Sequence, residues 1–188
     1  GMIGLQQEIS WNIGAALLHE FDLWNREGVF TLDAYHSFFE NQLVVDLDQS
    51  AREIHFYALN GRSYSNSIQA ELNYDINRRM SIRTAYRFLD VKTDYLTGLL
   101  EKPFVSKHRG FLNVAYSTRK RKGKQWVADL TTQFIGSQRI PYTGDNVGPY
   151  VLDERSPNYV MLNGQITRHT SEKFSAYIGV ENATNFRQ

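Results

Sequence analysis

Charged and amide side chains recur at every second position through the middle of the chain. In the stretch SIQAELNYDINRRMSIRTAYRF they alternate with apolar residues, and the same spacing returns in ADLTTQF. Carboxylate, guanidinium and amide groups in such a row can bind polar solutes and ions, as they do along the wall of a water-filled pore. The residues that we expect to line such a wall are Gln69, Glu71, Asn73, Arg83, Arg87, Asp129 and Gln133.

A second group of candidate binding residues lies in the two longest segments between the alternating stretches. Tyrosine rings pack on sugars or flat chelates, and carboxylates bind cations or hydroxyl groups, so a ligand-binding mouth would use both types. Ordinary polar loops have the same composition, and that alternative stays open. The candidates are Asp94, Tyr95, Tyr142, Asp145, Tyr150 and Asp153.

Patterns typical of catalytic or metal sites are missing from the sequence. The five His residues are scattered without an HExxH spacing, and no G-x-S-x-G motif occurs. The chain has no Cys, which excludes disulfides and thiolate ligands. The basic run at 119–124 has no neighbouring aromatic stacking platform, and the net charge is only +1, so neither favours nucleic-acid binding. We therefore expect no catalytic residue, no cofactor, no metal and no nucleic-acid partner.

The elements that must position the polar row are β-strands. Apolar and polar residues alternate with a period of two, which is the spacing of the two faces of a strand. No segment shows a convincing helical period, so we expect an all-β protein built as an antiparallel up-and-down meander of about eight long strands. The expected strands cover residues 11–21, 30–38 continuing through NQLVVDL, 56–76, 79–88, 111–117, 126–135, 159–167 and 174–180.

The links between these strands alternate in length along the chain. DLWNREG, DINRR, RKRKGKQ and HTSEK are short and charged, whereas the links after residues 90 and 136 are long. Short turns on one rim and long loops on the other are typical of barrels in outer membranes. A soluble meander usually keeps most of its links short.

Two architectures fit the alternation. One is a soluble β-barrel that binds a small apolar ligand inside its apolar face. The other is a transmembrane barrel with its apolar face in lipid, which the strand lengths, the alternating links and the uncharged polar residues of the other face favour. Eight strands alone would close around a narrow lumen and bury Glu71, Arg83, Arg87 and Asp129, at several kcal/mol for each unpaired charge. We therefore expect part of a wider barrel.

Five short segments, taken in their order and spacing, resemble one known family. They are YIGVENATNFRQ (177–188), EISWNIG (8–14), EKPFVSKHRGFLNVAYST (101–118), FIGSQRIP (134–141) and SPNYVMLNGQIT (156–167). Together they are similar to the C-terminal part of the β-barrel of TonB-dependent outer-membrane receptors, of the kind common in Bacteroidetes. The resemblance covers nearly the whole chain.

This resemblance implies a transporter in the outer membrane of a Gram-negative bacterium. Such receptors have a barrel of about twenty-two strands around an N-terminal plug, and they import iron–siderophore complexes, cobalamin or glycans. Their partners are the outer-membrane lipid and the TonB complex, which is contacted through the N-terminal plug region. The sequence shows no plug, no TonB-contact segment and no closing strand. We therefore expect residues 1–188 to be a fragment of the barrel domain that cannot transport by itself.

Overall fold

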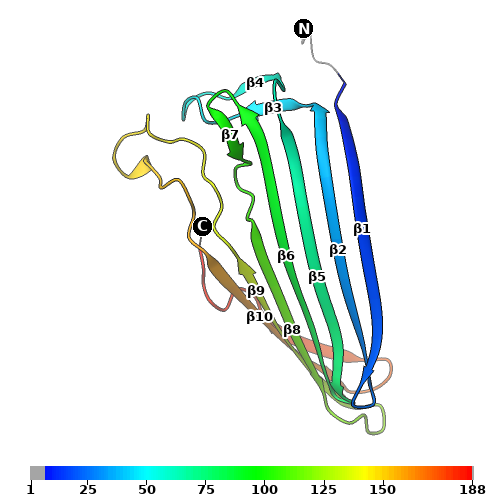
Figure 1. Ribbon diagram of the computed structural model, residues 1–188. Helices are drawn as coiled ribbons and strands as arrows, with labels where there is room; N and C mark the ends of the chain where they lie inside the picture. Colours follow the sequence, from blue (N-terminus) through cyan, green and yellow to red (C-terminus); the bar gives the residue numbers. More distant parts are fainter. Residues whose placement is uncertain (1–6, 188) are drawn as a thin grey trace.

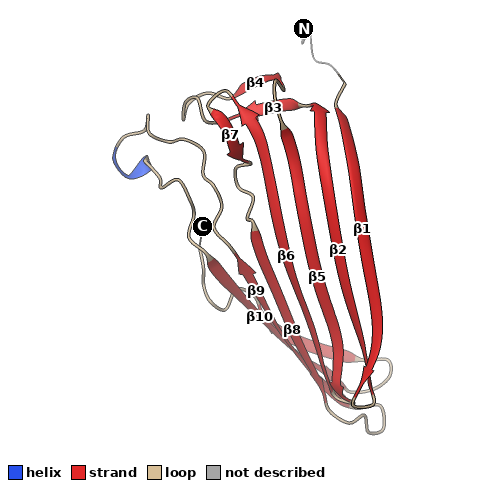
Figure 2. Cartoon of the chain, in the orientation of Figure 1, coloured by secondary structure: helices blue, strands red, loops and turns tan. Residues whose placement is uncertain are grey.

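The computed structural model describes residues 7–187, and its main feature is one large antiparallel sheet (Figures 1 and 2). The sheet follows chain order, which confirms the predicted meander. A short strand, β7 (Gly98–Glu101), pairs with the end of β6. The main strands, in order, are β1 (Ile9–Leu23), β2 (Arg26–Asn41), β5 (Ser63–Asn77), β6 (Met80–Tyr95), β8 (His108–Ser117), β9 (Gln125–Ile135), β10 (Tyr159–His169) and β11 (Ser175–Val180).

The remaining regular structure lies in the long connections. β3 (Leu43–Asp46) and β4 (His55–Ala58) form a separate two-stranded sheet between β2 and β5. A single 3₁₀ turn, η1 (Gly148–Tyr150), lies between β9 and β10. Across residues 7–187, none of the helical structure is long and apolar enough to cross a membrane.

The short links and the long links lie at opposite ends of the sheet, as expected. The short turns gather at the lower end in Figure 1, and the long connections, with β3, β4 and β7, lie at the upper end. In the β1–β2 turn, Trp24 and Asn25 both have positive φ, which matches the right-handed twist of the two strands. β2 and β6 have 16 residues each, more than the roughly 9–11 that cross a bilayer, so they extend beyond it.

The strand expected over residues 56–76 is wrong as a single element. The strand structure is interrupted between β4 and β5 at Gly61, whose φ is +141°. The backbone N–H of the next residue, Arg62, donates to Asp94 Oδ2 at 2.7 Å. The extension of β2 through NQLVVDL is also wrong, because β3 turns away to pair with β4. Apolar and polar residues alternate through both interruptions, so the sequence pattern did not reveal where one strand ends and the next begins to pair with a different strand.

Replacing Gly61 by Ala should destabilise the base of this loop. A Cβ at Gly61 would lie 2.5 Å from Asp94 Oδ2 in a backbone conformation that L-residues rarely adopt, so we expect a loss of about 1–3 kcal/mol. Gly98→Ala is the matched control, because φ is +124° there but a Cβ meets nothing within 4 Å. Thermal unfolding of the protein in detergent compares the two variants. Equal melting temperatures would contradict the role of the Asp94 contact.

The pairing register separates two chemically different faces of the sheet. Leu17, Leu32, Ala70 and Tyr86 form one row across β1, β2, β5 and β6, and rows above and below it on this face are also mainly apolar. This face lacks a covering layer within the described residues. Many of its large side chains are exposed, with Ile178 75% accessible. A soluble barrel would bury such a face, so the apolar-ligand carrier is not favoured.

The sheet has almost no core of its own. Within residues 7–187 the buried hydrophobic side chains are Val44, Tyr95 and Ile135, and all three lie at or near the long-connection end. The sheet curls, so that β11 lies behind the front strands in Figure 1. A curled sheet with an exposed apolar face and a polar opposite face is the wall of a larger barrel that meets lipid outside.

Candidate functional site

The seven residues expected on a polar wall all lie on the same face of the sheet. Gln69 is paired with Arg87 and Asn73 with Arg83 across β5 and β6, while Asp129 and Gln133 continue this face on β9. Glu71 accepts hydrogen bonds from Arg83 Nε at 3.0 Å and Asn73 Nδ2 at 2.9 Å. Glu71 and Arg83 therefore neutralise each other along the wall.

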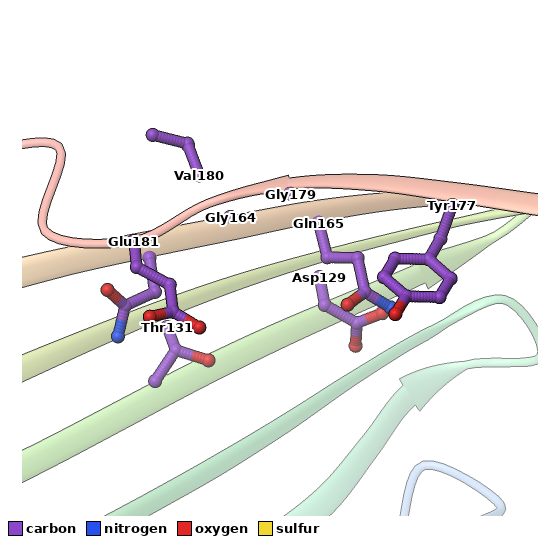
Figure 3. A pocket seen from close by; sticks show the side chains of 9 residues that line it. Asp129, Thr131, Gly164, Gln165, Tyr177, Gly179, Val180 and Glu181 are labelled. Carbon is purple, nitrogen blue, oxygen red and sulfur yellow. The ribbon is translucent and has the colours of Figure 1, made fainter.

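A polar hollow of about 500 Å³ lies over β9, β10 and β11 on this face. Asp129, Gln165 and Tyr177 project to the same side of the sheet in Figure 3, whereas Val180 projects to the opposite side. Hydroxyl, amide and carboxylate groups gathered beside an aromatic ring can bind hydroxyl-rich solutes. Apart from Asp129, these residues were not among the expected site residues, although alternation along β10 and β11 places them on the polar face. The polar side chains that line the hollow are Asp129, Thr131, Asn163, Gln165, Tyr177 and Glu181.

A second hollow, of about 320 Å³, lies on the same face across β5, β6, β8 and β9. Three of the expected residues line it: Gln69, Arg87 and Gln133. Arg109 and Phe111 of β8 complete its polar and aromatic lining. The fold thus brings together side chains that lie far apart in the sequence, because neighbouring strands are in register.

The candidate residues expected in the long links do not form one cluster, and Asp94 and Tyr95 belong to β6, which continues past residue 90. Asp94 accepts the Arg62 N–H at the base of the β4–β5 loop. Tyr95 is buried, and the Arg139 guanidinium lies 5.6 Å from its ring centroid. Only Tyr142 and Asp145 are brought together, through a hydrogen bond of 3.3 Å from the Tyr142 hydroxyl.

The remaining candidates of these connections lie on the molecular surface. Tyr150 is exposed at the end of η1, and Asp153 is exposed further along the same connection. Tyr150 and Tyr142 therefore offer accessible aromatic surface at the upper end of the sheet.

The sheet has three long connections: β2–β5 (residues 42–62), β6–β8 (residues 96–107) and β9–β10 (residues 136–158). A buried ion pair links the β2–β5 connection to the β9–β10 connection. Arg139 donates from Nη1 and Nη2 to the two carboxylate oxygens of Asp48, at 2.7 and 3.0 Å, and its Nε donates to the Glu101 carbonyl at 2.5 Å. The Tyr142 N–H donates to Asp48 Oδ1 at 3.1 Å. Both charged side chains are largely buried, so removing either partner alone would leave an unpaired charge in the interior. Sequence reasoning missed it, because no local pattern links residues so far apart.

Glu101 links the β6–β8 connection to the Asp48–Arg139 pair. Its carboxylate pairs with Lys107 Nζ at 2.6 Å and Arg155 Nη1 at 2.9 Å, and Lys107 also lies 3.2 Å from Asp90. Residues of all three long connections therefore meet in one charged cluster. We call it the loop network, and it consists of Asp46, Asp48, Tyr57, Asp90, Glu101, Lys107, Arg139 and Arg155.

The loop network shifts the pKa values of several of its members. Burial raises the pKa of Asp46, but hydrogen bonds from the Asp48 N–H, the Tyr57 hydroxyl and Gln49 outweigh it, so the pKa is lowered from 3.8. Burial likewise opposes the bonds from Lys107 and Arg155 to Glu101, whose pKa is lowered from 4.5. Burial and the Asp46 carboxylate raise the pKa of Tyr57 to about 12. These pKa shifts favour ionised carboxylates at Asp46 and Glu101 and an uncharged Tyr57 hydroxyl.

The connections should loosen at both extremes of pH. Asp46 and Glu101 have lowered pKa values in the fold, so their contribution is complete above about pH 4.5 and is lost as the pH falls through those values. The raised pKa of Tyr57 stabilises below pH 10, and this contribution is lost as the pH rises towards about 12. A spin label at exposed Val147 (Val147→Cys) should gain mobility in both ranges. Asp46→Asn should reduce the acid change, and an unaltered profile would contradict this role.

These observations define a class of protein: the wall of a β-barrel in a membrane, with a polar inner face and structured loops on one rim. Residues 3–183 match the family described as TonB dependent receptor-like, beta-barrel, so the chain belongs to this family. Its members reside in the Gram-negative outer membrane and serve TonB-dependent transport. No match was found among curated proteins or among solved structures.

Proposed function

We propose that this protein takes up a large, scarce, polar nutrient, of the class of iron–siderophore complexes, cobalamin or glycans, without converting it chemically. In this proposal the long connections capture the nutrient and the polar face conducts it. Energy comes from the TonB complex through an N-terminal plug region of the same receptor.

One observation carries this proposal: the two hollows lie on the polar face of the sheet and share their lining with expected wall residues. Asp129 belongs to the first hollow, and Gln69, Arg87 and Gln133 belong to the second. Together the two hollows provide acidic, basic, amide and aromatic groups, as a large solute with many polar groups requires. A small apolar ligand would need an enclosed apolar cavity instead.

Uptake assays in the native bacterium test the proposal. Cells lacking the receptor gene should lose uptake of one member of a panel of labelled ferric siderophores, cobalamin and oligosaccharides. Cells lacking TonB should show the same loss, because both deletions remove the energised step. Uptake of the whole panel that persists in the receptor deletion would contradict the substrate class. Uptake that requires the receptor but not TonB would contradict the energy source.

A further inference from the structure

Two arginines face each other on the polar face. Arg87 of β6 and Arg109 of β8 are direct register partners, and both line the 320 Å³ hollow. Like charges directly opposite on neighbouring strands repel each other and destabilise the pair. An anion bound beside the two guanidinium groups would relieve this repulsion.

Within residues 7–187, neither arginine has a carboxylate partner. Glu71, a near acidic neighbour on this face, is already bound by Arg83 and Asn73. Asp33 is opposite Gln69 in the register, so it is separated from Arg87 by a whole strand. This part of the wall thus carries an excess of two positive charges.

The hollow provides what an oxyanion needs. Guanidinium groups donate parallel hydrogen bonds to a carboxylate or phosphate, and the amides of Gln69 and Gln133 offer further donors beside them. We propose that Arg87 and Arg109 form a binding site for an anionic group, a carboxylate or similar oxyanion, of the transported solute. The inference rests on the proposed function, because it assigns a charge to the nutrient that passes along the wall.

The position of the site favours a solute over a side chain of the receptor itself. Arg109 is the second residue of β8, two residues after the loop network residue Lys107, and Ile135 beside it is the last residue of β9. Both strand ends open into long connections. A solute that enters from the long-loop end would therefore reach this site before the 500 Å³ hollow, whose β9 residues Asp129 and Thr131 lie nearer the short turns.

Citrate binding to the purified full-length receptor in detergent tests the site. Calorimetric titration at low salt should detect citrate binding to the wild type. Arg87→Gln and Arg109→Gln should each raise the Kd roughly tenfold to a hundredfold, as expected for a lost charge-assisted hydrogen bond. Arg87→Lys should give an intermediate Kd, because it keeps the charge but loses the planar fork.

Arg121→Gln is the matched control, since it removes one positive charge from the β8–β9 turn at the opposite end of the sheet. It should leave the Kd within about twofold of the wild type, because exposed charges this far away are screened. Citrate that fails to bind the wild type, as it would if an acidic plug side chain filled the site, would overturn the proposal. Equal binding by wild type and both Gln variants would also overturn it. Neither result bears on TonB-dependent uptake, which the deletion assays test separately.

Discussion

Arg139→Met in the full-length receptor should open the long connections. The substitution leaves the largely buried Asp48 carboxylate without its bidentate partner, and breaking one side of a buried ion pair costs about 3–5 kcal/mol. It also removes the hydrogen bond to the Glu101 carbonyl and the contact with the Tyr95 ring. The three connections would then lose the residue that holds them together.

Limited digestion with chymotrypsin measures this opening. Cleavage at Tyr142 or Tyr150 should accelerate at least about 100-fold, because the cleavage rate follows the population of the open loop. Arg62→Met is the matched control: its Nε lies 3.5 Å from Asp94 Oδ2 and its own side chain is largely exposed, so the loss should be about 0.2–1 kcal/mol. Similar cleavage rates for Arg139→Met and the wild type would contradict the role of the loop network.

A double substitution distinguishes the loss of the Asp48–Arg139 attraction from the cost of leaving one buried charge unpaired. Asp48→Leu combined with Arg139→Met removes both charges, and a buried pair replaced by apolar residues of similar size often loses little stability. We therefore expect the double variant to be cleaved more slowly than Arg139→Met alone. Faster cleavage of the double variant would mean that the other hydrogen bonds of Asp48, such as that from the Tyr142 N–H, dominate.

Leu130→Arg should weaken insertion into the membrane. Leu130 is central in β9 and exposed on the apolar face, and a charge on the lipid face near the bilayer midplane costs about 2–4 kcal/mol. Asp129→Arg is the matched control, because the adjacent residue lies on the polar face and lines the first hollow. Substitution there places a charge in water and should cost less than about 1 kcal/mol.

Folding into lipid vesicles from urea distinguishes the two faces. The folded fraction, seen as a shift in gel mobility without heating, should fall at a lower urea concentration for Leu130→Arg than for Asp129→Arg. If both variants lose folding equally, the assignment of the two faces is wrong. If Asp129→Arg alone loses folding, the faces are reversed and the apolar residues line the interior.

The site was partly predictable because strand geometry is local. Successive side chains of a strand point to opposite faces, so alternation around Glu71 and Arg83 was enough to place the wall residues on one side. Which wall residues share a hollow depends on the register between strands. The meeting of Arg87 with Arg109 therefore appears only when β6 and β8 are paired.

The sequence by itself determined the strand class, the two faces, the alternation of short and long links and the family. Only the tertiary structure decided the breaks at Gly61 and after β2, the burial of Tyr95, and the loop network. The reason is the range of the interactions. Periodicity is a property of adjacent residues, whereas the partners Asp48 and Arg139 lie 91 residues apart and meet only when the whole sheet has formed.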